Sequence, residues 1–280
     1  MDIGIITLKK FDGKESVGSS RIRGEWVANH WDDAEIYKYG KKYDVVIYQK
    51  AYWPEHARDF DGLKILDICD PDFFHWNYPI KETIVECDAV TASTEELAKQ
   101  FRNFTDSPVK WIDDRVDVEA VDGQMDGVKQ HEGKAKKVVW YGYSQNFPML
   151  KPAVKAINDN NLELIVISDN SFRSPAPYRD LPVTNYRHNW ETVYGDIQEG
   201  DIVLNPQGTS GQWKYKSKNK TYLAWALGMP VAHSDDELEN FIDAEARQQE
   251  AKEKRQLVKE KHHSKQSVVE YKELIDSLQN

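Results

Sequence analysis

Short apolar runs alternate with helix-like segments along most of the chain. The apolar runs, which contain many β-branched residues, predict strands at residues 3–8, 43–49, 63–69, 87–93 and 109–113, and again at 136–143, 162–168, 201–206 and from Pro230. Helices are expected through Trp26 and Trp31, from Ser93 to Phe101, over 148–160 and over 217–227. Strands that alternate with helices indicate βαβ units and therefore parallel sheets.

A polar, glycine-bearing segment at 119–136 interrupts this pattern, which then restarts. The sequence therefore predicts an α/β protein of two Rossmann-like domains that face each other across a cleft. The first domain covers 1–118, the linker 119–136 and the second domain 137–234. A charged, helix-prone tail at 235–280 is expected to pack back on the body, because it carries apolar residues such as Val268 and Leu274.

Composition narrows the function classes. The chain has 280 residues, 40% of them hydrophobic, which is enough for two cores, and a net charge of −10. A protein that binds nucleic acid through charge alone should be basic, so the acidic balance argues against a generic DNA-binding protein. No apolar run is long enough to predict a membrane span, and Cys69 and Cys87 lie in strand-like runs as expected of buried thiols in a reducing compartment. We therefore expect an intracellular, cytoplasmic protein; its oligomeric state is not predicted.

The segment KYKSKNKTYLAWALGMPVA contains an unusual charge pattern. Lys214, Lys216, Lys218 and Lys220 stand just before or within the start of a predicted helix, with Ser217 as its N-cap. Positive charge is unfavourable at that end of a helix dipole unless an anion binds there. Lys216, Lys218 and Lys220, together with Ser217 and Thr221, therefore predict a diphosphate site; a solvated basic loop is the alternative.

Several motifs together resemble GT-B glycosyltransferases. They are GSSRIRG (18–24), KKVVWYGY (136–143), GDIVLNP (200–206) and NKTYLAWALGMPVA (219–232). The common retaining branch of that family has a glutamate where this chain has Leu223, so the resemblance does not specify the donor nucleotide or the stereochemistry. It implies a metal-independent transferase without a cofactor, whose co-substrate is a nucleotide sugar such as a UDP-sugar.

The resemblance also suggests residue roles. Donor binding is expected from residues of the three glycine- or lysine-bearing loops and one strand end: Gly18, Ser19, Arg21, Arg23, Gly142, Ser144, Asn146, Asn205, Lys216, Ser217, Lys218, Asn219, Lys220 and Thr221. Asn146 could instead cap a helix, and Asn205 could fix its own turn.

A general base for the acceptor hydroxyl is expected just after the strand LKILDIC. Asp70 is the first candidate, followed by Asp72 and His75, whereas Asp67 is favoured as a structural residue. Asp70-Pro71 is equally compatible with a simple turn. No metal site is predicted.

Three function classes stay open. The leading one is a glycosyltransferase that acts on a saccharide, a protein or a hydroxymethylated DNA base. The third acceptor is included because the GT-B-like enzymes that the chain resembles include compact phage enzymes that glycosylate such bases. Aromatic residues interleaved with Arg and His, as in FFHWNYP and NYRHNW, suit a flat acceptor. The alternatives are a non-catalytic module that binds a nucleotide or sugar phosphate, and a sugar-nucleotide epimerase.

Overall fold

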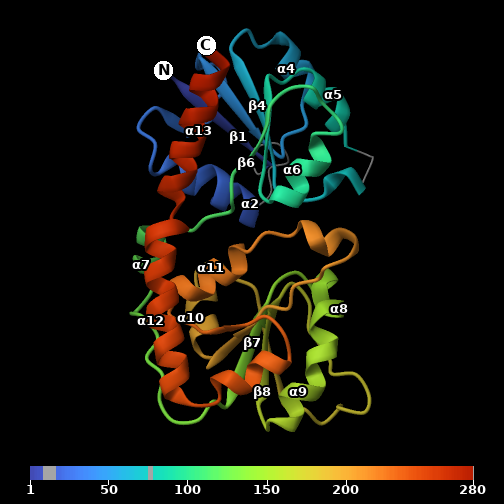
Figure 1. Ribbon diagram of the computed structural model, residues 1–280, viewed down its shortest axis with the longest axis vertical. Coiled ribbons are helices and arrows are strands. Elements are labelled where there is room, and N and C mark those ends of the chain that lie inside the picture. The colour runs from blue at the N-terminus through green and yellow to red at the C-terminus, as the bar shows by residue number, and fades with distance from the viewer. Residues whose placement is uncertain (9–16, 75–77, 280) are drawn as a thin grey trace. The chain divides into compact units, whose positions relative to one another are not determined.

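The computed structural model describes residues 1–8, 17–74 and 78–279, which form two units with one parallel sheet each (Figure 1). Unit 1 comprises Met1–Asp117, Ser210–Asn219 and His262–Asn280, and unit 2 comprises Val118–Thr209 and Lys220–Lys261. The prediction of an α/β protein with two parallel, Rossmann-like sheets is confirmed.

Unit 1 contains a six-stranded parallel sheet in the order β2-β1-β3-β4-β5-β6. The strands are β1 Ile3–Thr7, β2 Ala34–Ile36, β3 Val45–Gln49, β4 Leu63–Ile68, β5 Ala89–Ala92 and β6 Val109–Trp111. The helices are α2 Gly18–Ser20, α3 Trp26–Ala28, α4 Pro54–Asp59, α5 Ile80–Val85, α6 Glu95–Phe101 and α13 Ser264–Gln279. Strands β1 and β3 are buried along their whole length, which explains their uninterrupted apolar sequences.

The sheet of unit 1 is covered on both faces. Alternate side chains such as Ile5, Ile47 and Ile65 pack with α3 and α13, and the intervening ones, such as Val46 and Leu66, pack with α5 and α6. Figure 1 shows α13 on one side of β1 and β4, and α5 and α6 on the other. The apolar face of the predicted C-terminal tail is thus part of a core, because Tyr271 and Leu274 of α13 are buried there.

Unit 2 contains a five-stranded parallel sheet in the order β11-β10-β7-β8-β9. Its strands are β7 Lys137–Tyr141, β8 Glu163–Ser168, β9 Val183–Arg187, β10 Ile202–Leu204 and β11 Val231–Ala232. Its helices are α7 Val118–Asp122, α8 Phe147–Leu150, α9 Val154–Asp159, α10 Val193–Gln198, α11 Asn219–Ala226 and α12 Ala244–Lys261. Leu150, Val154 and Ile157 pack one face of this sheet.

The strand order reverses once in each sheet. In unit 1, β2 pairs with one edge of β1, and the next strand, β3, pairs with the other edge of β1. In unit 2, β8 and β9 extend the sheet on one side of β7, and the next strand, β10, pairs with the other side of β7. Ligands of open α/β sheets bind at the carboxyl ends of the strands at such a reversal. These two positions are therefore where functional side chains are expected.

Some local predictions are wrong. Residues 18–21 are helical rather than a loop, because α2, a π-helical turn at Arg21–Glu25 and α3 follow one another directly, and Trp31 lies beyond the end of that helical run. The helix of α6 is capped by Thr94, whose hydroxyl accepts from the amide of Leu97, whereas the hydroxyl of Ser93 donates to the carbonyl of Cys69.

The segments outside the two predicted domains contain regular structure. Residues 119–136 include most of α7, in which Val118 and Val121 are buried. The tail from 235 divides between the units, with α12 in unit 2 and α13 in unit 1. Arg247 of α12 is 0% exposed and donates to four backbone carbonyls, of Glu132, Gly133, Phe241 and Ile242, so this cation holds two chain segments of unit 2 together.

Two global features follow from the described residues. No helix among them is both long enough and apolar enough to cross a membrane. Cys69 and Cys87 are buried and free, and burial raises the pKa of Cys87 to about 12, so this thiol stays protonated and unreactive at neutral pH.

Candidate functional site

The reversal point of unit 2 gathers several of the predicted donor-binding residues. Gly142 follows β7 and Asn205 follows β10, so both stand at the carboxyl ends of adjacent strands. The ammonium of Lys220 lies 5.2 Å from the ring centroid of Trp140 at the end of β7. Gly142 has a φ of +151°, and a Cβ there would lie 2.2 Å from Nζ of Lys220, so a side chain at 142 would displace this cation.

Asn205 is tied to the helix that carries Lys220. Its side-chain amide donates to the hydroxyl of Thr221 at 3.0 Å, and Thr221 is fully buried. The hydrogen bond fixes the first turn of α11 against the end of β10. Asn205 and Thr221 therefore position the start of this helix, and only the more exposed Asn205 has surface left for a ligand.

Ser144 belongs to a separate hydrogen-bonded turn after β7. Its amide donates to Asp169 at 2.7 Å, its hydroxyl donates to the same carboxylate at 3.1 Å, and Asn170 donates to that hydroxyl at 2.9 Å. Burial would raise the pKa of Asp169, but the hydrogen bonds from Ser144 outweigh it and lower the pKa. Asn146 stands at the N-cap position of α8 without a side-chain cap bond. Asp169 and Asn170 were not predicted from the sequence.

The start of α11 differs from the prediction. The helix begins at Asn219, and Ser217 is not its cap, since the hydroxyl of Ser217 donates to Asp114 at 2.6 Å. The side-chain nitrogen of Asn219 is buried and has no hydrogen-bond partner among the residues that the structure describes. A buried donor without an acceptor is costly unless a ligand supplies the acceptor. Asn219 thus marks the helix start as a place for a ligand oxygen.

In unit 1 the predicted base Asp70 lies between two lysines. Its Oδ2 accepts from Nζ of Lys50 at 2.9 Å, and its Oδ1 accepts from Nζ of Lys216 at 2.6 Å. Lys50 follows β3 and Asp70 follows shortly after β4, so both stand at the carboxyl ends of paired strands. Lys50 was not predicted as a site residue, because nothing in the sequence around it forms a motif.

The electrostatics keep Asp70 ionised. Burial alone would raise the pKa of Asp70, but the charges of Lys50 and Lys216 outweigh it and lower the pKa below its ordinary value. Asp70 is therefore a carboxylate at neutral pH and can accept a proton. Its basicity would increase if one of the two lysines moved away.

Asp72 is the more enclosed of the two neighbouring carboxylates. Its Oδ2 accepts from the hydroxyl of Tyr52 at 2.7 Å and lies 3.2 Å from Nζ of Lys50. Its backbone amide donates to the carbonyl of Asp70 at 2.8 Å. These contacts indicate that Asp72 positions Lys50 and does not contact a substrate. The third candidate base, His75, lies outside the described residues.

The lysines of the segment 214–220 do not act as one group. Lys214 stands 4.7 Å from the ring centroid of Tyr215, Lys216 binds Asp70, and Lys218 is exposed. Residues 210–219 group with unit 1, whereas Lys220 groups with unit 2. The charge pattern seen in the sequence is thus distributed over several partners, and Lys220 is the lysine at the reversal point of unit 2.

Arg23, a predicted donor-binding residue, is a structural cation. It is 3% exposed, and its guanidinium donates to both oxygens of Asp67, to Asp114 and to the carbonyl of Ile112. Asp67 also accepts from Thr91 at 2.6 Å and from Tyr271 at 2.9 Å. We therefore exclude Arg23 from the candidate donor site. Among its predicted neighbours, Gly18, Ser19 and Arg21 lie in the helical run and are partly exposed.

The carboxylate of Asp114 makes the stability of unit 1 pH-dependent. Burial raises its pKa to about 6, against the opposing influence of Arg23 and of the hydroxyl of Ser217. Because the folded protein holds this proton at a pH where the unfolded chain has lost it, the contribution to stability is present at acidic pH and is lost as the pH rises through about 6.

We expect the Asp114→Asn variant to remove this dependence. The stability of the wild type relative to the variant should fall by up to about 3 kcal/mol between pH 4 and pH 8, since the pKa rises by roughly two units. Urea titrations of both proteins at several pH values measure this difference. A difference that does not change with pH would show that Asp114 does not titrate in this range.

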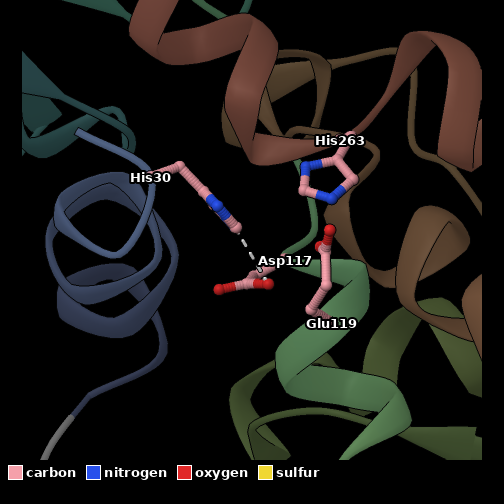
Figure 2. A group of neighbouring side chains, drawn as sticks. All are labelled: His30, Asp117, Glu119 and His263. Atoms are coloured by element: carbon pink, nitrogen blue, oxygen red, sulfur yellow. Dashed lines mark ion pairs between the residues drawn. The ribbon is translucent and has the colours of Figure 1, made fainter. Parts of the chain in front are cut away.

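A histidine cluster elsewhere in unit 1 has residue types that suit metals (Figure 2). Figure 2 shows His30, Asp117 and His263 directed toward one another; Glu119, drawn with them, belongs to unit 2. Nε2 of His30 lies 3.1 Å from Asp117. The amide of Lys265, however, donates to Nδ1 of His263 at 3.1 Å.

This hydrogen bond argues against metal binding by His263. A neutral histidine that accepts at Nδ1 carries its proton on Nε2, and a protonated nitrogen cannot coordinate a metal. Nδ1 itself is occupied at the start of α13. The contact of His30 with Asp117 and the hydrogen bond accepted by His263 therefore fit a structural role better than a metal site.

The comparisons with known proteins identify the fold. No protein family model and no curated protein matches the chain. Among solved structures, BGT of T4 phage, in complex with its UDP-glucose substrate, matches with a TM-score of 0.58 and 11% identity over 99% of each chain. AviGT4, a glycosyltransferase involved in avilamycin A biosynthesis, matches with a TM-score of 0.54 and 12% identity over 97% of this chain and 96% of AviGT4.

A third similar structure is an O-GlcNAc transferase mutant from Thermobaculum terrenum, with a TM-score of 0.54 and 10% identity over 99% of this chain and 67% of the transferase chain. Likeness at such low identity establishes architecture rather than activity. The resemblance drawn from the sequence motifs is confirmed at that level: this chain has the GT-B fold of glycosyltransferases.

Proposed function

We propose that the protein is a glycosyltransferase that moves a sugar from a nucleoside diphosphate sugar to an acceptor hydroxyl. The observation that carries the proposal is Asp70, an ionised carboxylate held between two lysines at the end of a parallel strand in a GT-B fold. An inverting transfer needs such a base, and a departing diphosphate needs cations.

The donor groups are those at the reversal point of unit 2 and the start of α11. Lys220 supplies a positive charge, Asn219 a buried amide donor, and Gly142 a backbone that leaves room for that cation. Helix starts and ammonium groups both favour a diphosphate, which supports a transfer that needs no metal. UDP-glucose is the first donor to test, because it is the substrate of the T4 phage BGT that shares this fold.

The chemistry assigns one proton transfer to Asp70. One carboxylate oxygen takes the proton of the acceptor hydroxyl as the hydroxyl oxygen forms its bond to the anomeric carbon. The bond between that carbon and the diphosphate breaks, and the nucleoside diphosphate leaves with the electron pair. Lys220 and the start of α11 stabilise the negative charge that develops on the leaving group.

The acceptor is expected to have a flat or apolar face. The rings of Phe74 and Tyr78, which follow Asp72 closely in the sequence, are 50% and 51% exposed. Tyr78 lies beside Tyr52, whose hydroxyl contacts Asp72, so this ring stands close to the carboxylates. A saccharide, a protein side chain or a hydroxymethylated base would each fit such rings.

One observation favours the alternative of a non-catalytic binding module. Both oxygens of Asp70 are engaged by lysines, and a carboxylate with a lowered pKa is a weak base. A binding module would bind a nucleoside diphosphate without consuming nucleotide sugar. Measuring the release of UDP from UDP-glucose therefore separates the two functions.

Replacing Lys220 with alanine tests the donor site. A charge-assisted hydrogen bond contributes about 1.5–3 kcal/mol, so Lys220→Ala should weaken UDP binding by roughly 10- to 100-fold in calorimetric titrations. Lys214→Ala, which removes an exposed lysine that stands over the ring of Tyr215, is the matched control and should bind UDP like the wild type. Equal affinities for all three proteins would remove Lys220 from the donor site.

A further inference from the structure

Lys50 occupies the reversal point of the sheet in unit 1. It follows β3, the strand that the chain places beside β1 after leaving β2. Its φ is +50°, a conformation that residues other than glycine rarely adopt, and its amide donates to the carbonyl of Asp67 at 2.9 Å. Unfavourable backbone conformations of this kind persist where the surrounding structure enforces them and are concentrated at functional sites. A glycine would adopt this conformation without strain, but the chain has a lysine here, and its side chain reaches Asp70 after the neighbouring strand β4.

The ammonium of Lys50 joins two carboxylates. It lies 2.9 Å from Oδ2 of Asp70 and 3.2 Å from Oδ2 of Asp72, and its side chain is 14% exposed. Asp72 is held in turn by the hydroxyl of Tyr52. Burial would lower the pKa of Lys50, but nearby Cys69, Asp70 and Asp72 raise it, so the ammonium keeps its charge.

The second lysine on Asp70 has a different character. Lys216 comes from the loop between β10 and α11, its side chain is 39% exposed, and it binds the other oxygen, Oδ1, at 2.6 Å. An exposed ion pair of this kind is weak and exchanges readily with other partners. Among the described residues, Oδ2 is thus held by the enclosed cation of Lys50, whereas Oδ1 is paired with the solvent-exposed cation of Lys216.

We propose that Lys50 is the positioning residue of the transfer reaction, which fixes Oδ2 of Asp70 and keeps Asp70 ionised so that Oδ1 can take the acceptor proton. This inference rests on the proposed function and adds a residue that the sequence motifs do not contain. Lys216, the exposed partner, gives up Oδ1, and the acceptor hydroxyl takes its place. Lys50 itself touches neither substrate.

The titration of Asp70 tests the assignment without any turnover. The titratable or charged groups around Asp70 are Lys50, Lys216, Cys69, Asp72 and Tyr52. Carbon-13 NMR of the Asp70 carboxyl group, assigned with the Asp70→Asn variant, follows its ionisation. In Lys50→Met the midpoint should rise by at least about one pH unit, because burial then acts with one compensating charge fewer.

Three variants make the test specific. Lys50→Arg keeps the charge and should restore a midpoint near that of the wild type. Lys50→Gly relieves the positive φ, so it should stay folded, and it should still raise the midpoint. Lys214→Met removes a lysine of the 214–220 segment that does not touch Asp70, and it should leave the midpoint unchanged.

Kinetics then connect the titration with the reaction. The acid limb of the pH profile of kcat should move to higher pH in Lys50→Met, with about a tenfold loss of turnover on its acidic side and a KM for the donor within about twofold. An Asp70 midpoint that is the same in Lys50→Met, Lys214→Met and the wild type would overturn the proposal. If the wild type consumes no nucleotide sugar, the proposed function fails, whereas the NMR titration still decides whether Lys50 controls Asp70.

Discussion

Replacing Asp70 with asparagine is expected to lower turnover by about 100- to 10,000-fold, the usual contribution of a general base. Asparagine has the same shape but cannot accept the proton of the acceptor hydroxyl. Donor affinity should change by less than about threefold, because a base acts in the transition state rather than in donor binding. Single-turnover kinetics with calorimetric titration of UDP measure both quantities.

Asp72→Asn is the matched control for this substitution. Asp72 lies two residues away in the same turn and also contacts Lys50, but the hydroxyl of Tyr52 covers its Oδ2. We expect a loss of turnover at least tenfold smaller than that of Asp70→Asn. Wild-type turnover in Asp70→Asn would remove Asp70 from the mechanism, and a larger loss in Asp72→Asn would transfer the role to Asp72.

Replacing Arg23 with leucine is expected to destabilise the protein by about 3–5 kcal/mol, the range seen when one partner of a buried ion pair is removed. The substitution leaves Asp67, which is 0% exposed, and Asp114, which is 6% exposed, without their cation. It also removes the link between β4 and the segment after β6, since Arg23 donates both to Asp67 and to the carbonyl of Ile112. Urea unfolding measures the free energy.

Arg58→Leu provides the comparison for Arg23. Arg58 of α4 pairs with Glu86 at 3.0 Å, but its side chain is 61% exposed, so the loss should be about 1 kcal/mol or less. Similar losses for the two variants would mean that the interior network around Arg23 contributes little, and that Arg23 is available for another role.

Strands with a continuous apolar sequence could be predicted from the sequence. Of the four edge strands, β6 and β11 were also predicted, whereas β2 and β9 were not. β3 and β8 are buried almost throughout, and their runs VVIYQ and ELIVIS indicate this directly. β9, with the sequence VTNYR, is an edge strand whose side chains are half-buried or exposed, so its sequence resembles that of a loop. β2 is likewise a short edge strand of three half-buried residues.

Residues of the candidate site could be predicted from the sequence only where they lie at or directly after the end of a predicted strand. Asp70 and Gly142 follow strand ends and could be found in this way. Lys50 could not, because its partner lies 20 residues further on and meets it only through the pairing of β3 with β4. Arg23 was misinterpreted because an arginine that binds a phosphate and one that binds buried aspartates look alike until the partners are known.

The central claim is tested most directly by measuring UDP release from UDP-glucose by the purified protein, with water or an added saccharide as the acceptor. A glycosyltransferase should release UDP well above the rate in buffer, and Asp70→Asn should reduce that rate by at least 100-fold while it still binds UDP. If the wild type binds UDP but releases none from UDP-glucose or from other UDP- and GDP-sugars, the proposed function is contradicted, and the binding module and the epimerase remain as the alternatives.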